Sequence, residues 1–334
     1  MTNNLTSFPF IVTDIGGTNA RFGIVTGEKD SNQRFIVDAQ ITYICRNYNK
    51  FEDVFSEYLD TVKHKSPKHA CIAIAAPVTG DEVEMTNLSW SFSINTLTQL
   101  NNLDSIRVIN DFGALAYSTL YLQSDELQTL YKGHQHADGT LLSRAIIGPG
   151  TGLGIAGLIN NGATWQPVCG EGGHISFAPL NAHQVALRNA LQSILNSQHI
   201  SIENLLSGPG LENIYNAICH INGQESQKLT ATEISDHARN GADKNSVETL
   251  QQFTQILGAS VGDIALTMGA FGGVYLSGGI LPKIVDVIDI ELLIQSYLNK
   301  GIKQELVKTV PIHLVLAPMP ALIGAAHWMN DQVN

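Results

Sequence analysis

The segment Ile-Arg-Val-Ile-Asn-Asp-Phe at residues 106–112 decides how the fold of this chain is interpreted. Its apolar residues predict a short buried strand, and residues 115–120 continue with the apolar spacing of a helix. Asn110 and Asp111 therefore follow a strand directly, and in open α/β sheets ligands bind at the carboxyl ends of strands. The alternative is structural, since Asn-Asp is also a turn signal and Asp111 could cap the helix that follows.

Length and charge narrow the class of protein. A chain of 334 residues is too long for one ordinary core, so two domains are expected. The balance of 19 basic against 30 acidic residues gives a net charge of −11, which would repel nucleic acid and anionic membranes. An anionic small molecule could bind only in a pocket that is arranged locally for it.

Cysteine usage and hydropathy predict a cytoplasmic protein. The 4 cysteines are widely spaced and form no CxxC pair, which is typical of free thiols in a reducing compartment. The polar N-terminus lacks the pattern of a secretory signal. The long apolar stretch at 256–281 contains Asp263 and several glycines, so a membrane-spanning helix is not expected.

Two glycine-rich turns follow predicted strands. The turn from Asp14 to Asn19 follows a strand at 10–13, and the turn from Gly148 to Gly154 follows a strand at 145–147. A second apolar strand comes after each turn, so the two regions form a weak internal duplication. Glycine lets a backbone turn sharply and bring its N–H groups to phosphate oxygens. An ordinary hairpin turn would also explain the glycines, and the chain has no Walker A motif.

Polar residues around these turns favour phosphate binding over a plain hairpin. Thr18 and Thr151 offer hydroxyl donors, and Arg21 offers a positive charge. Asp14 could hold Mg²⁺ through water, because this cation prefers oxygen ligands. A third glycine turn, Ser277-Gly278-Gly279, follows a predicted strand and would let an adenine or ribose lie against the backbone. A strand-to-helix turn is the alternative for that segment.

A glycine-framed pair of polar residues points to sugar-like ligands. Glu171 and His174 have the E-x-x-H spacing that places two metal ligands on one face of a helix. Gly172 and Gly173 disfavour a helix, so a metal site is not expected here. The pair suits hydroxyl groups instead, and each charge-assisted hydrogen bond contributes roughly 1.5–3 kcal/mol. Glu203, considered alone, is typical of a solvated surface charge.

The remaining periodicity predicts the helices and strands of an α/β chain. Residues 51–62 have the spacing of an amphipathic helix that faces the core. Thr230 and Glu233 form a capping box for a helix near 231–240. Other helices are expected at 183–196, 210–219 and 247–268 and from Pro320 onward, and other strands at 34–43, 71–78, 274–276 and 313–317, with 82–86 as the hairpin partner of 71–78.

A series of motifs resembles, in order, the bacterial glucokinase family. The motifs are DIGGTNAR at 14–21, MTNLSWSFS at 85–93, INDF at 109–112, GPGTGLG at 148–154, GEGGH at 170–174, LSGPGL at 206–211 and FGGVYLSGGI at 271–280. The resemblance implies an α/β, two-lobed actin-like ATPase (ribonuclease H-like) fold with a central cleft, shared with hexokinases. It also implies ATP-dependent phosphorylation of D-glucose at the 6-hydroxyl. We expect a small α/β domain of residues 1–112 plus about 319–334, and a large α/β domain of residues 113–318.

The resemblance implies roles for the residues that match the family's motifs. Asp111 matches the catalytic base, and Asn110 beside it contacts the sugar. Glu171, His174 and Glu203 match further sugar ligands. The ATP site is implied to include Thr13, Asp14, Ile15, Gly16, Gly17 and Thr18 in the first turn, Thr151 and Gly152 in the second, and Gly278 and Gly279 in the third, with Mg²⁺ held by Asp14 through water. Pro149 stands where many members of the wider superfamily carry an acidic residue.

Other functions on the same fold are alternatives. A kinase of this fold could act on fructose, mannose or an N-acetylated hexosamine. The repressor-related sugar kinases usually carry a cysteine-rich zinc motif near the sugar loop, and here Cys169 alone lies nearby in sequence. A non-catalytic sugar-sensing protein and an actin-like filament protein are further alternatives. The expected partners are glucose and ATP, and the family also suggests a homodimer.

Overall fold

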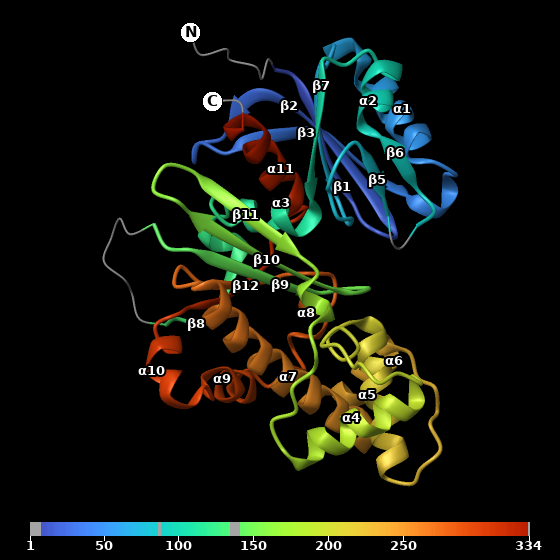
Figure 1. The fold of residues 1–334 in the computed structure, drawn as a ribbon, viewed down its shortest axis with the longest axis vertical. Coiled ribbons are helices and arrows are strands. Elements are labelled where there is room, and N and C mark those ends of the chain that lie inside the picture. Colours follow the sequence, from blue (N-terminus) through green and yellow to red (C-terminus); the bar gives the residue numbers. More distant parts are fainter. Residues whose placement is uncertain (1–7, 86–87, 134–140, 333–334) are drawn as a thin grey trace. The chain divides into compact units, whose positions relative to one another are not determined.

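The computed structural model describes residues 8–85, 88–133 and 141–332, and its contacts divide the chain into two compact units (Figure 1). The first unit contains the chain up to Glu126, Ala163–Cys169 and the segment from Ala317 onward. The second contains Leu127–Gly162 and Gly170–Leu316. The predicted domain boundaries stay a prediction; the first contact-based unit extends past residue 112 to Glu126 and also includes Ala163–Cys169.

The first unit is built on a five-stranded sheet with the order β3-β2-β1-β4-β7. Strand β1 pairs antiparallel with β2 and parallel with β4, and β4 pairs parallel with β7. The register sets Ile15, Ile74 and Asn110 level with one another, so three strands end at one edge of the sheet. The strands are β1 (Phe10–Ile15), β2 (Asn19–Lys29), β3 (Phe35–Ile44), β4 (His69–Ile74) and β7 (Ser105–Asn110).

Helices cover both faces of this sheet. Helix α1 (Phe51–Val62) buries Phe51, Phe55 and Tyr58 against one face, which confirms the helix predicted there. Helices α3 (Asp111–Ser118) and α11 (Pro320–Asp331) pack together over the other face. A Cβ added at Gly324 of α11 would overlap the carbonyl oxygen of Ala114, so only glycine allows the two helices to approach so closely.

The predicted hairpin between residues 71–78 and 82–86 is wrong. Strand β4 ends at Ile74 and lies between β1 and β7, so it has no free edge for another strand. Strand β5 (Glu82–Glu84) pairs instead with β6 (Ser91–Ser93), which leads into helix α2 (Ile94–Leu100). Short 3₁₀ helices of this unit are η1 (Cys45–Asn47), η2 (Lys63–Lys65) and η3 (Ser124–Glu126).

The sheet of the second unit repeats the strand arrangement of the first. Its six strands follow the order β11-β10-β9-β12-β13-β8, with β9 antiparallel to β10 and parallel to β12, and β12 parallel to β13. The four strands β10-β9-β12-β13 match β2-β1-β4-β7 in both order and direction, so the internal duplication is confirmed, as is the ribonuclease H-like topology. The strands are β8 (Leu127–Tyr131), β9 (Arg144–Pro149), β10 (Leu153–Asn160), β12 (Val274–Leu276) and β13 (Ile312–Val315); β11 (Trp165–Gly170) belongs mostly to the first unit.

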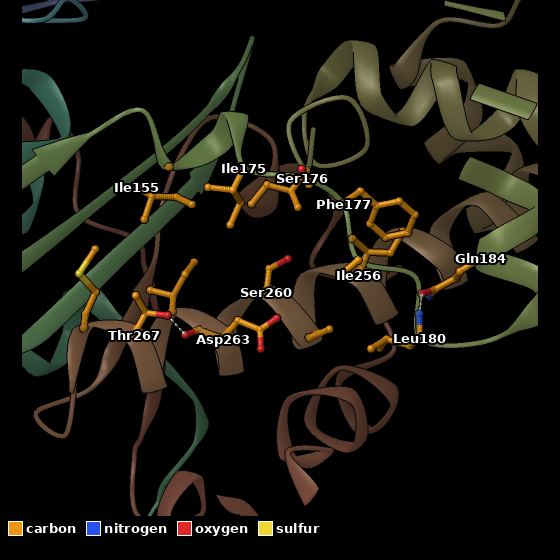
Figure 2. A pocket seen from close by; sticks show the side chains of 16 residues that line it. Ile155, Ile175, Ser176, Phe177, Leu180, Gln184, Ile256, Ser260, Asp263 and Thr267 are labelled. Carbon is orange, nitrogen blue, oxygen red and sulfur yellow. Dashed lines mark hydrogen bonds between the residues drawn. The ribbon is translucent and has the colours of Figure 1, made fainter. Parts of the chain in front are cut away.

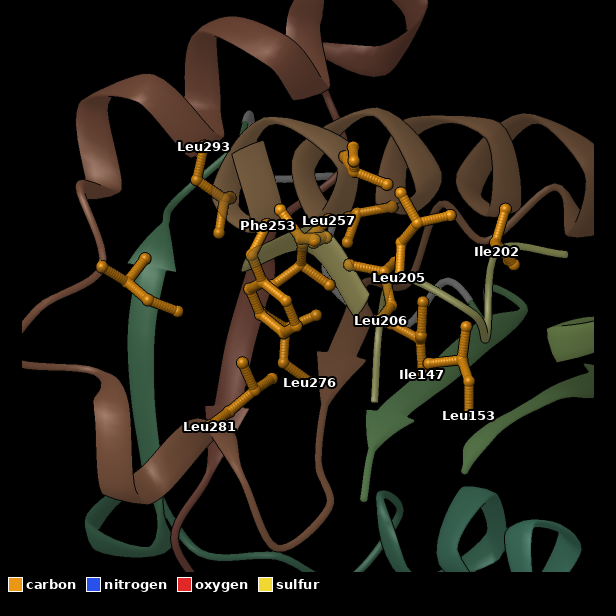
Figure 3. Packing of buried hydrophobic residues seen from close by; sticks show 14 of the residues in the cluster. Ile147, Leu153, Ile202, Leu205, Leu206, Phe253, Leu257, Leu276, Leu281 and Leu293 are labelled. Atoms are coloured by element: carbon orange, nitrogen blue, oxygen red, sulfur yellow. The ribbon is translucent and has the colours of Figure 1, made fainter. Parts of the chain in front are cut away.

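A long central helix organises the core of the second unit. Helix α7 (Lys244–Met268) contacts α5, α6 and α9, and its Phe253 and Leu257 pack with Leu276 and Leu293 (Figure 3). The predicted capping box of Thr230 and Glu233 is confirmed at the start of α6. The other helices are α4 (Ala182–Ile194), α5 (Gly208–Ile221), α6 (Ala231–Asn240), α8 (Leu281–Ile284), α9 (Ile290–Leu298) and α10 (Gln304–Val307), with 3₁₀ helices η4 (Gly172–His174) and η5 (Gly301–Lys303). Within the described ranges, no helix is both long and apolar enough to cross a bilayer.

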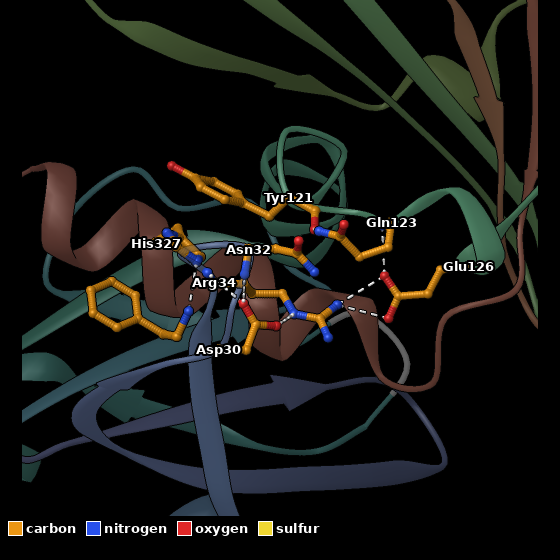
Figure 4. A network of polar contacts seen from close by, with 8 residues as sticks. Asp30, Asn32, Arg34, Tyr121, Gln123, Glu126 and His327 are labelled. Atoms are coloured by element: carbon orange, nitrogen blue, oxygen red, sulfur yellow. Dashed lines mark hydrogen bonds and ion pairs between the residues drawn. The ribbon is translucent and has the colours of Figure 1, made fainter.

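A polar network in the first unit lies beside a buried histidine, His327 (Figure 4). The Arg34 guanidinium donates through Nη1 to both carboxylate oxygens of Glu126, at 2.7 and 2.8 Å. The backbone N–H of Phe35 donates to Nε2 of His327 at 3.1 Å, and the Tyr121 ring stacks on the imidazole. Burial, with added repulsion from nearby cationic groups, lowers the pKa of His327 to about 3.

Folding stability should therefore fall in acid because of His327. The unfolded histidine takes up a proton near pH 6.5 and the folded one only near pH 3, so its contribution is complete above pH 6.5 and is lost as the pH falls through that window. Between pH 7.5 and 5.0 the wild-type protein should lose about 2 kcal/mol of unfolding free energy relative to His327→Gln, whose amide cannot titrate. Urea denaturation of both proteins at the two pH values measures this, and parallel profiles would contradict it.

Candidate active site

The first glycine turn joins β1 to β2 in the first unit. The N–H of Gly16 donates to the carbonyl of Asn19 at 3.0 Å and closes a tight turn, with Thr18 exposed at its tip. The Sγ of Cys45 lies 3.5 Å from the carbonyl oxygen of Gly16, and this contact supports the turn. The turn therefore presents backbone groups and the Thr18 hydroxyl to solvent at the edge where β1 ends.

Asp14 and Arg21 form an ion pair at the base of this turn. They are opposite each other in the β1–β2 register, and Nη1 of Arg21 donates to Oδ2 of Asp14 at 2.8 Å. The side chain of Asp14 is only 15% exposed. Burial raises its pKa, and the charge and hydrogen bond of Arg21 oppose that rise. Arg21 is thus engaged with Asp14 and does not point freely toward a phosphate.

Thr13 faces the core rather than the turn. Its neighbours at alternate positions, Ile11 and Ile15, belong to the apolar cluster on the α1 side of the sheet, whereas Val12 belongs to the cluster on the other side. Thr13 is fully buried, and its hydroxyl has no hydrogen-bond partner among the described residues. Any part of Thr13 in nucleotide binding would have to come from its backbone.

Asn110 and Asp111 occupy the junction between β7 and α3. The side-chain oxygen of Asn110 accepts from the N–H groups of Phe112 and Gly113, at 3.0 and 3.2 Å, so Asn110 is the helix cap. The capping role considered for Asp111 therefore falls to its neighbour, and Asp111 is the first residue of the helix, partly exposed. The positive end of the helix dipole favours a carboxylate there.

The first turn and Asp111 lie at the same edge of one sheet. Strands β1 and β7 are separated by β4 alone, and the register sets Ile15 level with Asn110. At the usual strand spacing the two chain positions are about 10 Å apart. The first unit thus brings together the segment Thr13–Thr18, Asn110 and Asp111.

Cys169 was not predicted at this junction. A Cβ added at Gly113 would lie 2.6 Å from Sγ of Cys169, so the thiol rests on the first turn of α3. Desolvation and the nearby charge of Asp111 raise the pKa of Cys169 to about 11. The thiol is therefore neutral near pH 7 and is a poor nucleophile.

The second glycine turn joins β9 to β10 in the second unit. The N–H of Gly150 donates to the carbonyl of Gly152 at 2.8 Å, and Thr151 is exposed at the tip. The N–H of Gly208, at the start of α5, donates to the carbonyl of Gly150 at 2.8 Å. This turn repeats the position of the first turn in its own sheet and is additionally attached to a helix terminus.

The predicted sugar ligands of the second unit gather beside this turn. His174 lies 4.0 Å from Oε2 of Glu171 and 3.8 Å from Oε1 of Glu203, measured from Nε2. Glu171 and His174 are exposed, whereas Glu203 is only 28% exposed. Oε2 of Glu203 accepts the N–H of Leu153 at 2.7 Å. The N–H at Nε2 of His199 donates to the carbonyl of His174 at 2.9 Å, a support for the loop that no sequence pattern indicated.

The third glycine turn abuts the second. Gly278 has a φ of +92°, and a Cβ added there would overlap the carbonyl oxygen of Pro149. The N–H of Ser277 donates to the carbonyl of Ile147 at 2.9 Å. Gly279 has open space around it. The second unit therefore brings together Thr151, Gly152, Glu171, His174, Glu203 and Gly278.

An apolar cavity of about 170 Å³ lies behind the sugar loop (Figure 2). Its walls include Gly172, residues 175–178 and the face of α7 that carries Ile256, Ser260 and Asp263. None of the predicted sugar or nucleotide ligands lines it, and its mainly aliphatic walls do not suit a polyhydroxyl molecule. Across the part of the chain that the structure describes, no group of three or more His, Cys, Asp or Glu side chains is arranged to hold a metal.

Two sheets of one topology, each with a glycine turn between its first two strands, define a protein of the actin-like ATPase class. The glucokinase of Saccharophagus degradans is 38% identical over 324 residues, which cover 97% of this chain and 99% of that protein. A family model described as Glucokinase matches residues 11–332. The chain belongs to the glucokinase family.

Solved structures agree with this assignment. The crystal structure of glucokinase from an Antarctic psychrotroph superposes with a TM-score of 0.86 at 34% identity, covering 98% of this chain and 100% of that one. The structure of glucokinase from Balamuthia mandrillaris in complex with glucose has a TM-score of 0.78 at 19% identity, covering 97% and 93% of the two chains. The second likeness supports the fold alone.

Alanine substitution should destabilise the protein at Gly278, where the backbone is restricted, but not at Gly279, which has open space around it. Gly278→Ala places a methyl group against the Pro149 carbonyl at a left-handed φ, and we expect a loss of about 2 kcal/mol or more in unfolding free energy. Gly279→Ala meets no atom within 4 Å, and we expect a change within about 0.5 kcal/mol. Urea denaturation of the two variants provides the comparison. Equal stability of the two variants would show that the packing at Gly278 is not a constraint.

Proposed function

We propose that the chain transfers the γ-phosphoryl group of ATP to the 6-hydroxyl of D-glucose and that Asp111 is the general base. Membership of the glucokinase family makes ATP-dependent phosphorylation of glucose the activity of this chain. The observation that supports Asp111 as the base is its position at the start of α3, on the sheet edge that also carries the first glycine turn. A partly exposed carboxylate at that edge can accept a hydrogen bond from a sugar hydroxyl.

Four other residues are proposed to bind the sugar. Glu171 and Glu203 offer carboxylate oxygens to sugar hydroxyls, and His174 lies between them. The oxygen of Asn110 caps α3, so this residue would contact the sugar as a donor through its amide nitrogen. Hydrogen bonds of neutral hydroxyls to charged groups are stronger than neutral pairs, which suits a small polar ligand.

The glycine turns are proposed to bind ATP. The N–H groups of Gly16 and Gly150 close their own turns, which leaves the N–H groups of the residues after them, with the exposed hydroxyls of Thr18 and Thr151, to face phosphate oxygens. Gly278 and Gly279 lie against the second turn and would let the nucleoside part approach the backbone. These groups favour the charge that develops on the phosphoryl oxygens during transfer.

A divalent cation such as Mg²⁺ is usual for kinases, and Asp14 fits an indirect contact with it. Oδ2 of Asp14 is engaged by Arg21, and within the described part of the chain Oδ1 has no hydrogen-bond partner. Mg²⁺ in kinases keeps several waters and binds substrate phosphates, so Asp14 would hold a metal-bound water through Oδ1. When bound, the cation neutralises phosphate charge.

The proposed chemistry is one in-line displacement. Asp111 accepts the proton of the sugar hydroxyl while the hydroxyl oxygen forms a bond to the γ-phosphorus and the bond from that phosphorus to the bridging oxygen of ADP breaks. Correct alignment of hydroxyl and phosphate can supply about 7–11 kcal/mol of the barrier reduction. The products are ADP, glucose 6-phosphate and a proton, which Asp111 returns to solvent.

We propose a cytoplasmic location for this protein. All 4 cysteines are free thiols, which suits a cytoplasmic protein. A homodimer is suggested by the family resemblance alone and stays a prediction.

Replacing the base should stop turnover and spare binding. In Asp111→Asn we expect kcat to fall by at least about 100-fold, because the amide cannot take the proton but can still accept the N–H of Phe112. The affinity for glucose should stay within about 5-fold, since one contact among several changes. A coupled assay for ADP and calorimetric titration with glucose measure the two quantities.

Asp104→Asn is the matched control, because Asp104 is an exposed carboxylate immediately before the amino end of the same strand, β7. It should leave kcat unchanged. Near-normal turnover in Asp111→Asn would refute the assignment of the base.

A sugar panel tests the substrate. With ATP and Mg²⁺, ADP release should be fastest with glucose among glucose, mannose, fructose and N-acetylglucosamine. Faster release with another sugar would assign a different hexose kinase activity. No sugar-dependent release from the wild-type protein would instead favour a sugar-sensing protein.

A further inference from the structure

The two oxygens of the Glu203 carboxylate have different neighbours. Oε1 faces His174, at 3.8 Å from Nε2, on the side of the proposed sugar ligands. Oε2 accepts the backbone N–H of Leu153 at 2.7 Å. Leu153 is the first residue of β10 and comes directly after the Gly150–Gly152 turn. The Glu203 carboxylate therefore lies near the proposed sugar ligand His174 through one oxygen and binds the backbone next to the proposed phosphate turn through the other.

The contact with the turn is close and sterically defined. A Cβ added at Gly152 would lie 2.5 Å from Oε2 of Glu203, so the carboxylate rests directly on the backbone of the turn. A residue with a side chain at 152 would displace it. Glycine at this position therefore allows the Glu203 carboxylate to approach the backbone of the turn.

The backbone that carries Glu203 is held firmly in place. Its N–H donates to the carbonyl of Gly173 at 2.9 Å, and its carbonyl accepts the Ser207 hydroxyl at 2.8 Å. The N–H of Gly208, the residue after Ser207, donates to the carbonyl of Gly150 in the turn at 2.8 Å. The segment from Glu203 to Gly208 therefore contacts the turn at both ends.

We propose that Glu203 is a positioning residue for the nucleotide in addition to a sugar ligand. Through Oε2 it holds the N–H of Leu153 and keeps the β9–β10 turn in the shape that binds phosphate. Through Oε1 it remains available to sugar hydroxyls. This inference rests on the proposed function, in particular on ATP binding at Thr151 and Gly152.

Sharing one carboxylate couples the two substrates. Sugar hydroxyls that donate to Oε1 withdraw electron density from the carboxylate, which weakens its repulsion of phosphate beside the same turn. Glucose should then raise nucleotide affinity, and by linkage the nucleotide should raise glucose affinity by the same factor.

The test is nucleotide binding without sugar. The dissociation constant of Mg-ADP is measured by calorimetric titration for the wild type, Glu203→Ala, Glu203→Gln and Glu171→Ala. We expect at least about 5-fold weaker binding in Glu203→Ala, because the turn loses a charge-assisted hydrogen bond. Glu203→Gln should bind Mg-ADP within 2-fold of wild type or more tightly, since its amide oxygen can still accept the N–H of Leu153.

Glu171→Ala is the matched control. Glu171 belongs to the same proposed sugar set and is 65% exposed, and in the described part of the chain its side chain forms no hydrogen bond or ion pair with the β9–β10 turn. It should lose glucose affinity and keep wild-type affinity for Mg-ADP. If Glu203 bound sugar alone, Glu203→Ala would keep wild-type affinity for Mg-ADP, as Glu171→Ala should. If its role were only structural, Glu203→Ala would weaken the binding of Mg-ADP and glucose equally.

Amide hydrogen exchange gives a readout that is independent of binding. In the protein without ligands, Glu203→Ala should speed exchange at Leu153, and Glu203→Gln should not. If Glu203→Ala does not fold, Glu203→Gln still decides, because equal losses of Mg-ADP and glucose affinity in that variant would overturn the proposal.

Unchanged Mg-ADP affinity in a folded Glu203→Ala would also overturn the proposal, even with a fully active wild-type enzyme. Failure of the proposed function would appear differently, as a wild-type protein that does not phosphorylate glucose.

Discussion

The parallel register of β1, β4 and β7 is the constraint on which the first half of the site depends. It sets the last residues of three strands level, so the glycine turn after β1 and the carboxylate after β7 emerge at one edge. A slip by one residue would turn Thr13 toward the face of Asp14 and bury a carboxylate in the apolar cluster around α1. The strand register thus fixes the positions of the glycine turn and of Asp111 in the protein without ligands.

The second half depends on close approach of backbones rather than on register alone. Gly152, Gly173 and Gly278 each lie where a side chain would overlap a neighbouring group of the same unit. These contacts press the sugar loop and the third turn against the β9–β10 turn. The groups proposed to bind sugar and phosphate are therefore linked by backbone contacts within one unit, and the proposed role of Glu203 depends on these contacts.

Much of this arrangement could be predicted from the sequence because the signals are local. The apolar runs before Asp14 and Gly148 and the capping box at Thr230 match the strands and the helix that the structure contains. The alternation of Ile11, Thr13 and Ile15 even contains the information that Thr13 faces the core. Strand β8, which mixes polar and apolar residues at a half-exposed edge, has no such signal.

Contacts between distant residues were beyond local patterns. The bond between Glu203 and Leu153 spans 50 positions, and that between His199 and the carbonyl of His174 spans 25. The pairing of β5 with β6 was missed because both neighbours of β4 are taken by strands from elsewhere in the chain. A local stretch of sequence cannot show that both edges of a strand are already paired with strands from distant parts of the chain.

The discontinuous first unit has a consequence for synthesis on the ribosome. Its sheet is complete in sequence by Asn110, but the helix that covers one face, α11, begins only at Pro320. The face that includes Phe10, Val12 and Cys71 therefore stays uncovered by α11 until nearly the whole polypeptide has emerged, while the second unit already has all its segments. A nascent chain of this protein can therefore cover that face only with α3 for most of its translation, and the uncovered apolar part of the sheet is the part of the first unit most open to aggregation before release.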